Sequence, residues 1–353
     1  MTTTAESYQS TSEGGRSKMK TVMVTGPGTT EVVEVPTPSA GPTDVLVRMR
    51  ACGICGSDSF YITIGGIPPR QGQTPLGHEP AGEVVEVGHR VEGIKPGDHV
   101  VINPITGGMI GSGGAGGALS EFLLIPDAKP GHNLAVLPPE VPLDVAALNE
   151  PMAVARHAVN RTGVQPGDSV VVFGAGPIGL GATIGYKLSG AHSVVVADVV
   201  PSRLEKALAV GADAVINSAE EDVVARLTEL HGSAATAMGK PRAGTDIYLD
   251  AAGVPVVVDT ALAAAKHGAT LGVVALHKKP VSVDFGAILD AEVNIVTSMG
   301  YPTEIFQVAE EIAQDWERFS LIISHRFPFA DVQQALTTAS TPGAAEKVVV
   351  IFD

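Results

Sequence analysis

Residues 170–179 read Val-Val-Val-Phe-Gly-Ala-Gly-Pro-Ile-Gly, and this stretch decides the fold of a large part of the chain. An apolar run that ends in Gly-x-Gly-x-x-Gly is typical of a buried parallel strand that turns sharply into a helix. Each glycine has a separate task in such a turn: Gly174 permits the bend, Gly176 lets the backbone approach a pyrophosphate, and Gly179 packs helix against strand. The same pattern can also serve packing alone, so the flanking residues must decide between a binding turn and a structural one.

The residues that follow favour a binding turn. The next apolar run, residues 193–198, ends in Asp198. A carboxylate at the end of this second strand can accept hydrogen bonds from the adenosine ribose hydroxyls, and it repels a 2′-phosphate. The sequence therefore predicts NAD rather than NADP, with a simple role at the start of a helix as the alternative for Asp198.

Strand-like and helix-like segments alternate from Val170 to about Ser298. Residues 202–210 are predicted to form a helix, with a capping box made by Ser202 and Glu205 at its start. Alternation of this kind indicates an α/β unit, a doubly wound parallel sheet.

The preceding part of the chain has a different pattern. From Lys20 to about Leu137, short β-rich runs such as residues 44–49 and 82–87 are separated by Gly and Pro. This predicts a barrel-like β unit. After about Tyr301 we expect a helix over residues 303–315, a strand over 321–324, another helix and a terminal strand over 348–352.

Composition limits the classes of function. The chain has 353 residues, enough for two domains, and a formal net charge of −15, which argues against a nucleic-acid or anionic-membrane partner. Residues 169–186 contain no charge, but their glycines and proline fit a strand and helix better than a membrane span. Residues 1–18 have no apolar core of a signal peptide, and we expect a flexible tail. Two cysteines three positions apart offer no disulfide framework, as is typical of a reducing cytoplasm.

A second set of residues points to a metal. Residues 52–58 read Cys-Gly-Ile-Cys-Gly-Ser-Asp, and residues 77–79 read Gly-His-Glu. Thiolate, imidazole and carboxylate are good zinc ligands. Their separation is far too long for a zinc finger, so the fold must bring them together, and such sites usually keep a coordination position open for catalysis.

Six motifs in the same order resemble the medium-chain dehydrogenase/reductase family, the zinc alcohol dehydrogenase superfamily, in its sorbitol and butanediol dehydrogenase branch. The motifs are Gly53–Asp58, Gly77–Glu79, Gly97–Val100, Asn149–Val154, the glycine turn, and Glu346–Val349. The resemblance implies a GroES-like β-barrel catalytic domain over 19–155 and 302–353 and a Rossmann NAD-binding domain over 156–301. It further implies a cytoplasmic homodimer or homotetramer that uses NAD and zinc.

The resemblance also assigns the site residues. It implies that Cys55, rather than Cys52, provides the zinc thiolate, with His78 and Glu79 as further ligands. Glu150 is expected at the metal, bound either directly or through a water. The remaining assignments are Asp58, which orients His78; Ser57, which receives the substrate proton; Tyr61, which lines the pocket or simply packs in the core; and the cofactor contacts Gly174, Gly176, Pro177, Ile178, Gly179, Asp198 and Arg203.

Three departures from the family pattern matter. Residues 106–117, where many members have four cysteines around a structural zinc, contain none, so we expect one zinc per chain. Phe60 stands where many alcohol dehydrogenases end a proton relay in histidine. In sorbitol-type members an arginine precedes a tyrosine that matches Tyr301, but here that position is Gly300.

The expected activity is hydride transfer between NAD and a secondary alcohol, a vicinal diol or a cyclic polyol, or the ketone in reverse. The alternatives are an L-threonine 3-dehydrogenase-like or linear sugar-alcohol activity and, more remotely, a non-catalytic nucleotide-binding protein. A zinc-free reductase of the same superfamily is disfavoured because it would lack the Cys55 and His78 pattern.

Overall fold

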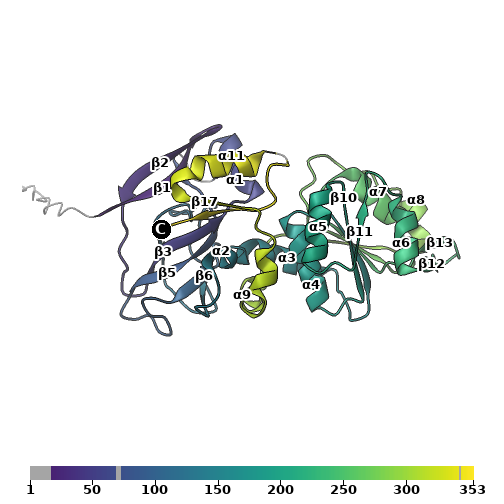
Figure 1. The fold of residues 1–353 in the computed structure, drawn as a ribbon, viewed down its shortest axis with the longest axis horizontal. Coiled ribbons are helices and arrows are strands. Elements are labelled where there is room, and N and C mark those ends of the chain that lie inside the picture. Colours follow the sequence, from purple (N-terminus) through teal and green to yellow (C-terminus); the bar gives the residue numbers. More distant parts are fainter. Residues whose placement is uncertain (1–16, 69–72, 342) are drawn as a thin grey trace, which may run out of the picture.

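A computed structural model describes residues 17–68, 73–341 and 343–353. Figure 1 shows two lobes, one rich in strands and one in which helices surround a sheet, with α2, α3 and α9 between them. The expected flexible tail falls almost entirely on residues 1–16, which lie outside the described residues.

The second lobe contains a six-stranded sheet. Its strands are β9 (Ser169–Phe173), β10 (Ser193–Asp198), β11 (Ala214–Asn217), β14 (Ile247–Asp250), β15 (Thr270–Val273) and β16 (Asn294–Thr297). They run parallel in the order β11-β10-β9-β14-β15-β16, so the strand order reverses between β9 and β14. In such sheets ligands bind beyond the carboxyl ends of the strands at this reversal.

Helices cover both faces of this sheet, which confirms the doubly wound α/β prediction. The helices and short strands of this lobe are α4 (Pro177–Leu188), α5 (Pro201–Ala209), α6 (Val223–His231), β12 (Ser233–Ala235), β13 (Pro241–Ala243), α7 (Pro255–Ala264) and α8 (Phe285–Ile288). Alternate residues of β9 enter different cores: Val172 packs in the cluster that contains Leu180 of α4, and Val171 in the one that contains Ala261 of α7. An uncharged strand such as β9 is therefore buried on both sides.

The first lobe is a β-barrel unit. Its strands are β1 (Lys18–Gly26), β2 (Thr29–Pro36), β3 (Val45–Gly53), β4 (Thr74–Pro75), β5 (Glu79–Val87), β6 (His99–Ile102), β7 (Phe122–Ile125), β8 (Leu134–Leu137), β17 (His325–Pro328) and β18 (Val348–Ile351). One sheet has the order β17-β18-β3-β5-β6-β8 with β7 also paired to β3, and a second has the order β2-β1-β4. The helices of this lobe and of the connection are α1 (Gly56–Ile64), α2 (Leu143–Ala146), α3 (Asn149–Arg161), α9 (Ile305–Gln314), α10 (Trp316–Ser320) and α11 (Val332–Ser340).

The chain returns to the first lobe after β16. Strand β18 pairs antiparallel with β3, placing Val350 opposite Cys52 and Val349 opposite Gly53. In Figure 1 the yellow elements α11 and β17 accordingly lie among the purple strands. This pairing brings residues near position 350 beside the metal-motif residues near position 55.

Some sequence expectations hold and others are wrong. Residues 169–186 form β9 and most of α4 as expected, and among the described residues no helix combines the length and apolar character needed to cross a bilayer. Helix α5 begins at Pro201 with Val200 as its N-cap, so Ser202 lies inside the first turn and the capping box with Glu205 is not formed. Residues 321–324 are not a strand; they follow α10, and the strand begins at His325.

Candidate metal and dinucleotide site

The fold brings three metal donors together. Cys55 is the N-cap of α1, directly after β3, and His78 precedes Glu79, the first residue of β5. Strands β3 and β5 are antiparallel neighbours with Gly53 opposite Glu79, so the two motifs meet at one end of the strand pair. One donor atom from each of the three side chains lies within 4.8 Å of the others.

Asp58 lies against two members of this group. Its side chain is fully buried, and its Oδ1 lies 3.3 Å from Nδ1 of His78. Its Oδ2 accepts a 2.9 Å hydrogen bond from the backbone N–H of Cys55. The contact at Nδ1 leaves Nε2 of His78 on the metal side, as expected for a carboxylate that orients a metal-binding imidazole. The Ser57 hydroxyl lies 3.3 Å from this Nε2.

Lys347 is a member of the site that the sequence analysis missed. It precedes β18, is buried, and donates to Oε2 of Glu79 and, at 3.0 Å, to the carbonyl of Ile54. Gly53 makes the required space, because a Cβ there would lie 1.7 Å from Glu79 Oε2. The one sequence signal for Lys347 is the terminal Glu-Lys-Val-Val motif, which indicates the family but does not by itself mark a residue of the site.

Charge governs the protonation of these groups. Burial alone would lower the pKa of His78, but the Asp58 carboxylate and Cys55 outweigh it and raise that pKa well above its usual value. Burial likewise disfavours a charged Lys347, yet Glu79 and Cys55 raise the pKa of this amine. The lysine therefore stays positively charged and forms a buried ion pair with Oε2 of Glu79.

Glu150 lies close to this group but is not one of its three donors. It is in the first turn of α3, is 8% exposed, and hydrogen bonds with the hydroxyl of Tyr301. Burial, with a further contribution from the charge of Glu79, raises the pKa of Glu150 to about 7. Burial and the charge of Glu150 also raise the pKa of Tyr301.

The residues present fit a zinc ion. Oε2 of Glu79 is held by Lys347, whereas its other oxygen, Oε1, is buried without a hydrogen-bond partner. A buried carboxylate oxygen without a partner is costly unless a ligand binds it. One thiolate, one imidazole and one carboxylate form a suitable ligand set for zinc that leaves room for a further ligand.

Three residues in or near the motif are not among its donors. Cys52 is fully buried in β3, outside the donor group, with Sγ 3.3 Å from the Gly53 carbonyl, and burial raises the pKa of its thiol. Tyr61 is partly buried and packs against the hydrophobic core of the barrel. Phe60 is 58% exposed.

The three glycines of the dinucleotide turn differ in what they contact. Gly174 has φ +96°, and a Cβ there would lie 3.1 Å from the backbone of Ala251. A Cβ at Gly179 would lie 1.8 Å from the Gly174 carbonyl. At Gly176, the N-cap of α4, a Cβ would meet nothing within 4 Å, and its φ of −74° suits any residue. Gly176 therefore leaves an open space at the start of a helix, where a pyrophosphate would bind.

The remaining cofactor candidates surround this turn. Pro177 and Ile178 form the first turn of α4. Asp198 ends β10, where its Oδ2 accepts from the Ala175 N–H at 2.7 Å and its Oδ1 from the Val200 N–H at 2.9 Å. Arg203 lies in α5, partly exposed. The Asp198 carboxylate thus holds the glycine turn through its backbone.

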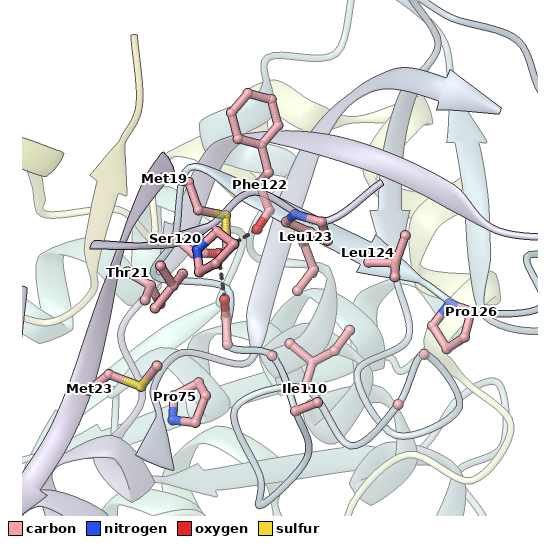
Figure 2. Close-up of a pocket in the computed structure, with 18 residues that line it drawn as sticks. Met19, Thr21, Met23, Pro75, Ile110, Ser120, Phe122, Leu123, Leu124 and Pro126 are labelled. Atoms are coloured by element: carbon pink, nitrogen blue, oxygen red, sulfur yellow. Dashed lines mark hydrogen bonds between the residues drawn. The ribbon is translucent and has the colours of Figure 1, made fainter. Parts of the chain in front are cut away.

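An apolar cavity of about 450 Å³ lies apart from these groups (Figure 2). It is lined by Met19 and Met23 of β1, Leu123 of β7, and the loop that contains Ile110. None of the three metal donors lines it, so the chemistry is not located there.

Comparisons with known proteins agree with this geometry. Residues 41–135 match the alcohol dehydrogenase GroES-like domain, and residues 177–315 match the zinc-binding dehydrogenase family. Sorbitol dehydrogenase of Bos taurus is 32% identical over 94% of this chain and 96% of its own length. The crystal structure of 2R,3R-butanediol dehydrogenase from Bacillus subtilis superposes with a TM-score of 0.83, at 27% identity, over 94% of this chain and 99% of that one.

A zinc-binding dehydrogenase from Sinorhizobium meliloti bound to NADP superposes with a TM-score of 0.81, at 26% identity, over 95% of this chain and 100% of that one. The matched domains, the relatives and the assembled donor set lead to the same conclusion. The chain belongs to the zinc-dependent alcohol dehydrogenases of the medium-chain family, in the branch of the sorbitol and butanediol dehydrogenases, and is an oxidoreductase.

Proposed function

We propose that the protein transfers a hydride between NAD and a secondary alcohol, vicinal diol or cyclic polyol, with one zinc per chain held by Cys55, His78 and Glu79. The observation that carries this proposal is the unpartnered Oε1 of Glu79 within a group whose donor atoms lie within 4.8 Å of one another. Zinc, when bound, supplies a Lewis acid that lowers the pKa of an alcohol oxygen. NAD, when bound, supplies the hydride acceptor.

The chain provides the proton transfer and the orientation of these groups. Ser57 is the proposed proton acceptor, because its partly exposed hydroxyl lies 3.3 Å from Nε2 of His78 and so faces the donor group. Asp58 keeps the His78 ring in place through Nδ1. The exposed Phe60 offers no continuation of a proton relay, so the proton leaves Ser57 toward solvent or the cofactor pocket.

Glu150 has a separate proposed task beside the metal. Burial raises its pKa, and Tyr301 orients it by donating a hydrogen bond. We propose that Glu150 contacts the metal through a water, since it is not one of the three clustered donors. Tyr61 is proposed only as a residue at the pocket margin.

NAD is the proposed cofactor because of Asp198. The carboxylate ends β10 beside the glycine turn, where it would repel a 2′-phosphate. The Sinorhizobium meliloti relative holds NADP, so the choice needs a direct test. The proposed contacts of the dinucleotide are Gly174, Gly176, Pro177, Ile178, Gly179, Asp198 and Arg203.

The proposed organisation follows the sheets. We assign 19–155 and 302–353 to the catalytic domain and 156–301 to the dinucleotide domain, since β18 pairs with β3 and the six parallel strands lie between.

A homodimer is proposed through β16, which is the edge of its sheet and exposes Ile295. Two dimers could form a tetramer. A cytoplasmic location is proposed because both cysteines are free.

The substrate proposal rests on Gly300. This residue, at the position of the polyol-binding arginine in sorbitol-type members, has φ +67° and no side chain, while neighbouring Met299 is 78% exposed. A missing hydrogen bond to a charged group costs about 1.5–3 kcal/mol, which corresponds to roughly tenfold or more in rate constant. We therefore expect small or cyclic secondary alcohols and vicinal diols to be better substrates than linear hexitols.

The decisive experiment compares kcat/KM with NAD for 2,3-butanediol and cyclohexanediol against sorbitol and xylitol, after elemental analysis of bound zinc. We expect kcat/KM to be roughly tenfold or more higher for the diols than for the linear polyols, from the same free-energy difference. A hexitol that wins would instead favour the linear sugar-alcohol activity, which the sorbitol dehydrogenase relative also suggests. Activity on L-threonine above all of these would favour the amino-alcohol alternative. Two zinc ions per chain would contradict the single-site proposal.

A further inference from the structure

A pair formed by a buried aspartate and a partly exposed histidine lies at the carboxyl ends of β14 and β15, and no step described above uses it. Asp250, the last residue of β14, is fully buried, and His277 follows β15 by four positions. Oδ2 of Asp250 lies 2.7 Å from Nε2 of His277. Oδ1 of the same carboxylate accepts from the backbone N–H groups of Ala252 at 2.9 Å and Gly253 at 2.8 Å.

The pair is connected to the glycine turn through close backbone contacts. Ala251 donates its N–H to the Phe173 carbonyl at 2.9 Å, and a Cβ at Gly174 would lie 3.1 Å from the Ala251 backbone. On the other side, Gly253 has φ +71°, and a Cβ there would lie 3.0 Å from the Leu276 carbonyl. Residues 250–253 are therefore packed between the dinucleotide turn and the segment that presents His277.

The protonation of the ring follows from its partner. A carboxylate only accepts hydrogen bonds, so Nε2 of His277 carries the proton and donates it to Asp250. The other ring nitrogen, Nδ1, is buried without a hydrogen-bond partner, although the side chain as a whole is 17% exposed. In a neutral ring this Nδ1 is an acceptor without a donor, a rare condition for a buried polar atom.

The position of the pair suggests which donor it meets. A dinucleotide spans the point where the strand order reverses, here between β9 and β14. Asp198 on β10 marks the adenosine side of that point, so β14 and β15 lie on the nicotinamide side. Groups there that can donate a hydrogen bond are the ribose hydroxyls and the carboxamide N–H of the nicotinamide nucleoside.

We propose that His277, held by Asp250, is a cofactor-contact residue whose Nδ1 accepts a hydrogen bond from the nicotinamide nucleoside half of the bound dinucleotide. This inference rests on the proposed NAD dependence. It adds a residue that positions the reactive end of the cofactor, whereas Asp198 and the glycine turn act on the adenosine and pyrophosphate parts.

Two substitutions separate contact from support. In His277→Gln the terminal amide can still donate to Asp250, but no acceptor remains at the place of Nδ1. In His277→Phe both interactions are lost. His267→Gln is the matched control, since His267 belongs to the same domain, and its half-exposed ring pairs with Glu292.

The test measures dissociation constants of the intact protein for NADH, ADP-ribose and AMP by titration calorimetry. Loss of one hydrogen bond should weaken the binding of NADH about three- to tenfold in both His277 variants. The affinity of these variants for AMP, and all affinities of the His267→Gln variant, should be unchanged. If ADP-ribose keeps its affinity, the donor is the carboxamide; if it weakens equally, the donor is a ribose hydroxyl. Acetylpyridine adenine dinucleotide, which lacks the amide N–H, should then be insensitive to the variants only in the first case.

Other outcomes would overturn the inference. Wild-type affinity for NADH in His277→Gln would show that the ring acts only as a hydrogen-bond partner of Asp250. An equal loss of affinity for AMP would indicate general damage to the domain. Unchanged NADH affinity in His277→Phe would show that His277 makes no contact with the bound dinucleotide. Wild-type protein that binds no NADH would instead contradict the proposed cofactor, which distinguishes the two failures.

Discussion

The proposed metal site and the proposed dinucleotide turn are built by opposite means. Cys55, His78 and Glu79 act through their side chains, and Glu79 depends on Lys347, 268 positions away in the sequence. The turn acts through backbone, and its glycines contribute by having no side chain. The first region should therefore fail when a side chain is removed, and the second when one is added.

The largest expected effect comes from Cys55→Ser. Loss of a zinc thiolate should lower kcat/KM by about a thousandfold or more, because Lewis-acid stabilisation amounts to several kcal/mol. Elemental analysis should show lower bound zinc in the same variant. Cys52→Ser is the matched control, since Cys52 lies outside the donor group; loss of zinc or activity there would reverse the assignment of the two cysteines.

Lys347→Met should destabilise the protein although it replaces none of the three metal donors. Removing one partner of a buried ion pair leaves Glu79 uncompensated, at a cost of about 3–5 kcal/mol in the free energy of unfolding. Urea denaturation with a chelator present measures this cost. The loss should be smaller when zinc is added, because the ion then balances the carboxylate, and smaller in the double variant Lys347→Met/Glu79→Gln. Equal losses in all conditions would argue against the pairing as the cause.

Two glycine substitutions test the turn. Gly179→Ala would set a Cβ 1.8 Å from the Gly174 carbonyl, and we expect a loss of about 3 kcal/mol in the free energy of unfolding. Gly176→Ala meets no protein atom within 4 Å, so stability should change by no more than about 0.5 kcal/mol. NADH affinity should nevertheless fall roughly tenfold, or about 1.4 kcal/mol. An unaffected affinity would mean that the cofactor does not approach at Gly176.

Asp198→Ser should have the smallest effect, on cofactor choice. Removing the negative charge should raise the ratio of kcat/KM for NADP to that for NAD by about tenfold, as relief of like-charge repulsion. Two backbone hydrogen bonds are lost as well, so Tm should fall. Asp198→Asn keeps an acceptor and should relax the preference with less loss of stability. Wild-type protein that already prefers NADP would refute the role of Asp198.

The sequence predicted the dinucleotide domain better than the rest, for a physical reason. A buried parallel strand, a glycine turn and a carboxylate at the next strand end are local features, and β9, α4 and β10 lie where they were expected. Local rules failed where two patterns compete. Pro201 starts α5 one residue before the predicted cap. Residues 321–324 follow α10, with Ile322 and Ile323 buried in the core, instead of pairing as a strand.

The metal site was predicted only in part, because its completion is not local. Cys55, His78 and Asp58 could be named from their motifs, and the structure brings them together. Lys347 could not, since only the pairing of β18 with β3 places it against Glu79. Glu150 was expected at the metal, directly or through a water, and this stays a prediction; its hydrogen bond with Tyr301 is a feature that no spacing in the sequence specifies.

The pairing of β3 with β18 also determines the order in which the two lobes can fold during synthesis. During synthesis β3 emerges early, but the strand that pairs with it emerges only after the whole parallel sheet has been translated. The dinucleotide domain is contiguous and can fold while the ribosome is still working. Until β18 has been synthesised, the edge of β3 at Ala51–Gly53 has no partner on that side. This edge lies beside the proposed metal ligands. The barrel lobe is thus the part of the chain whose strand pairing is completed last.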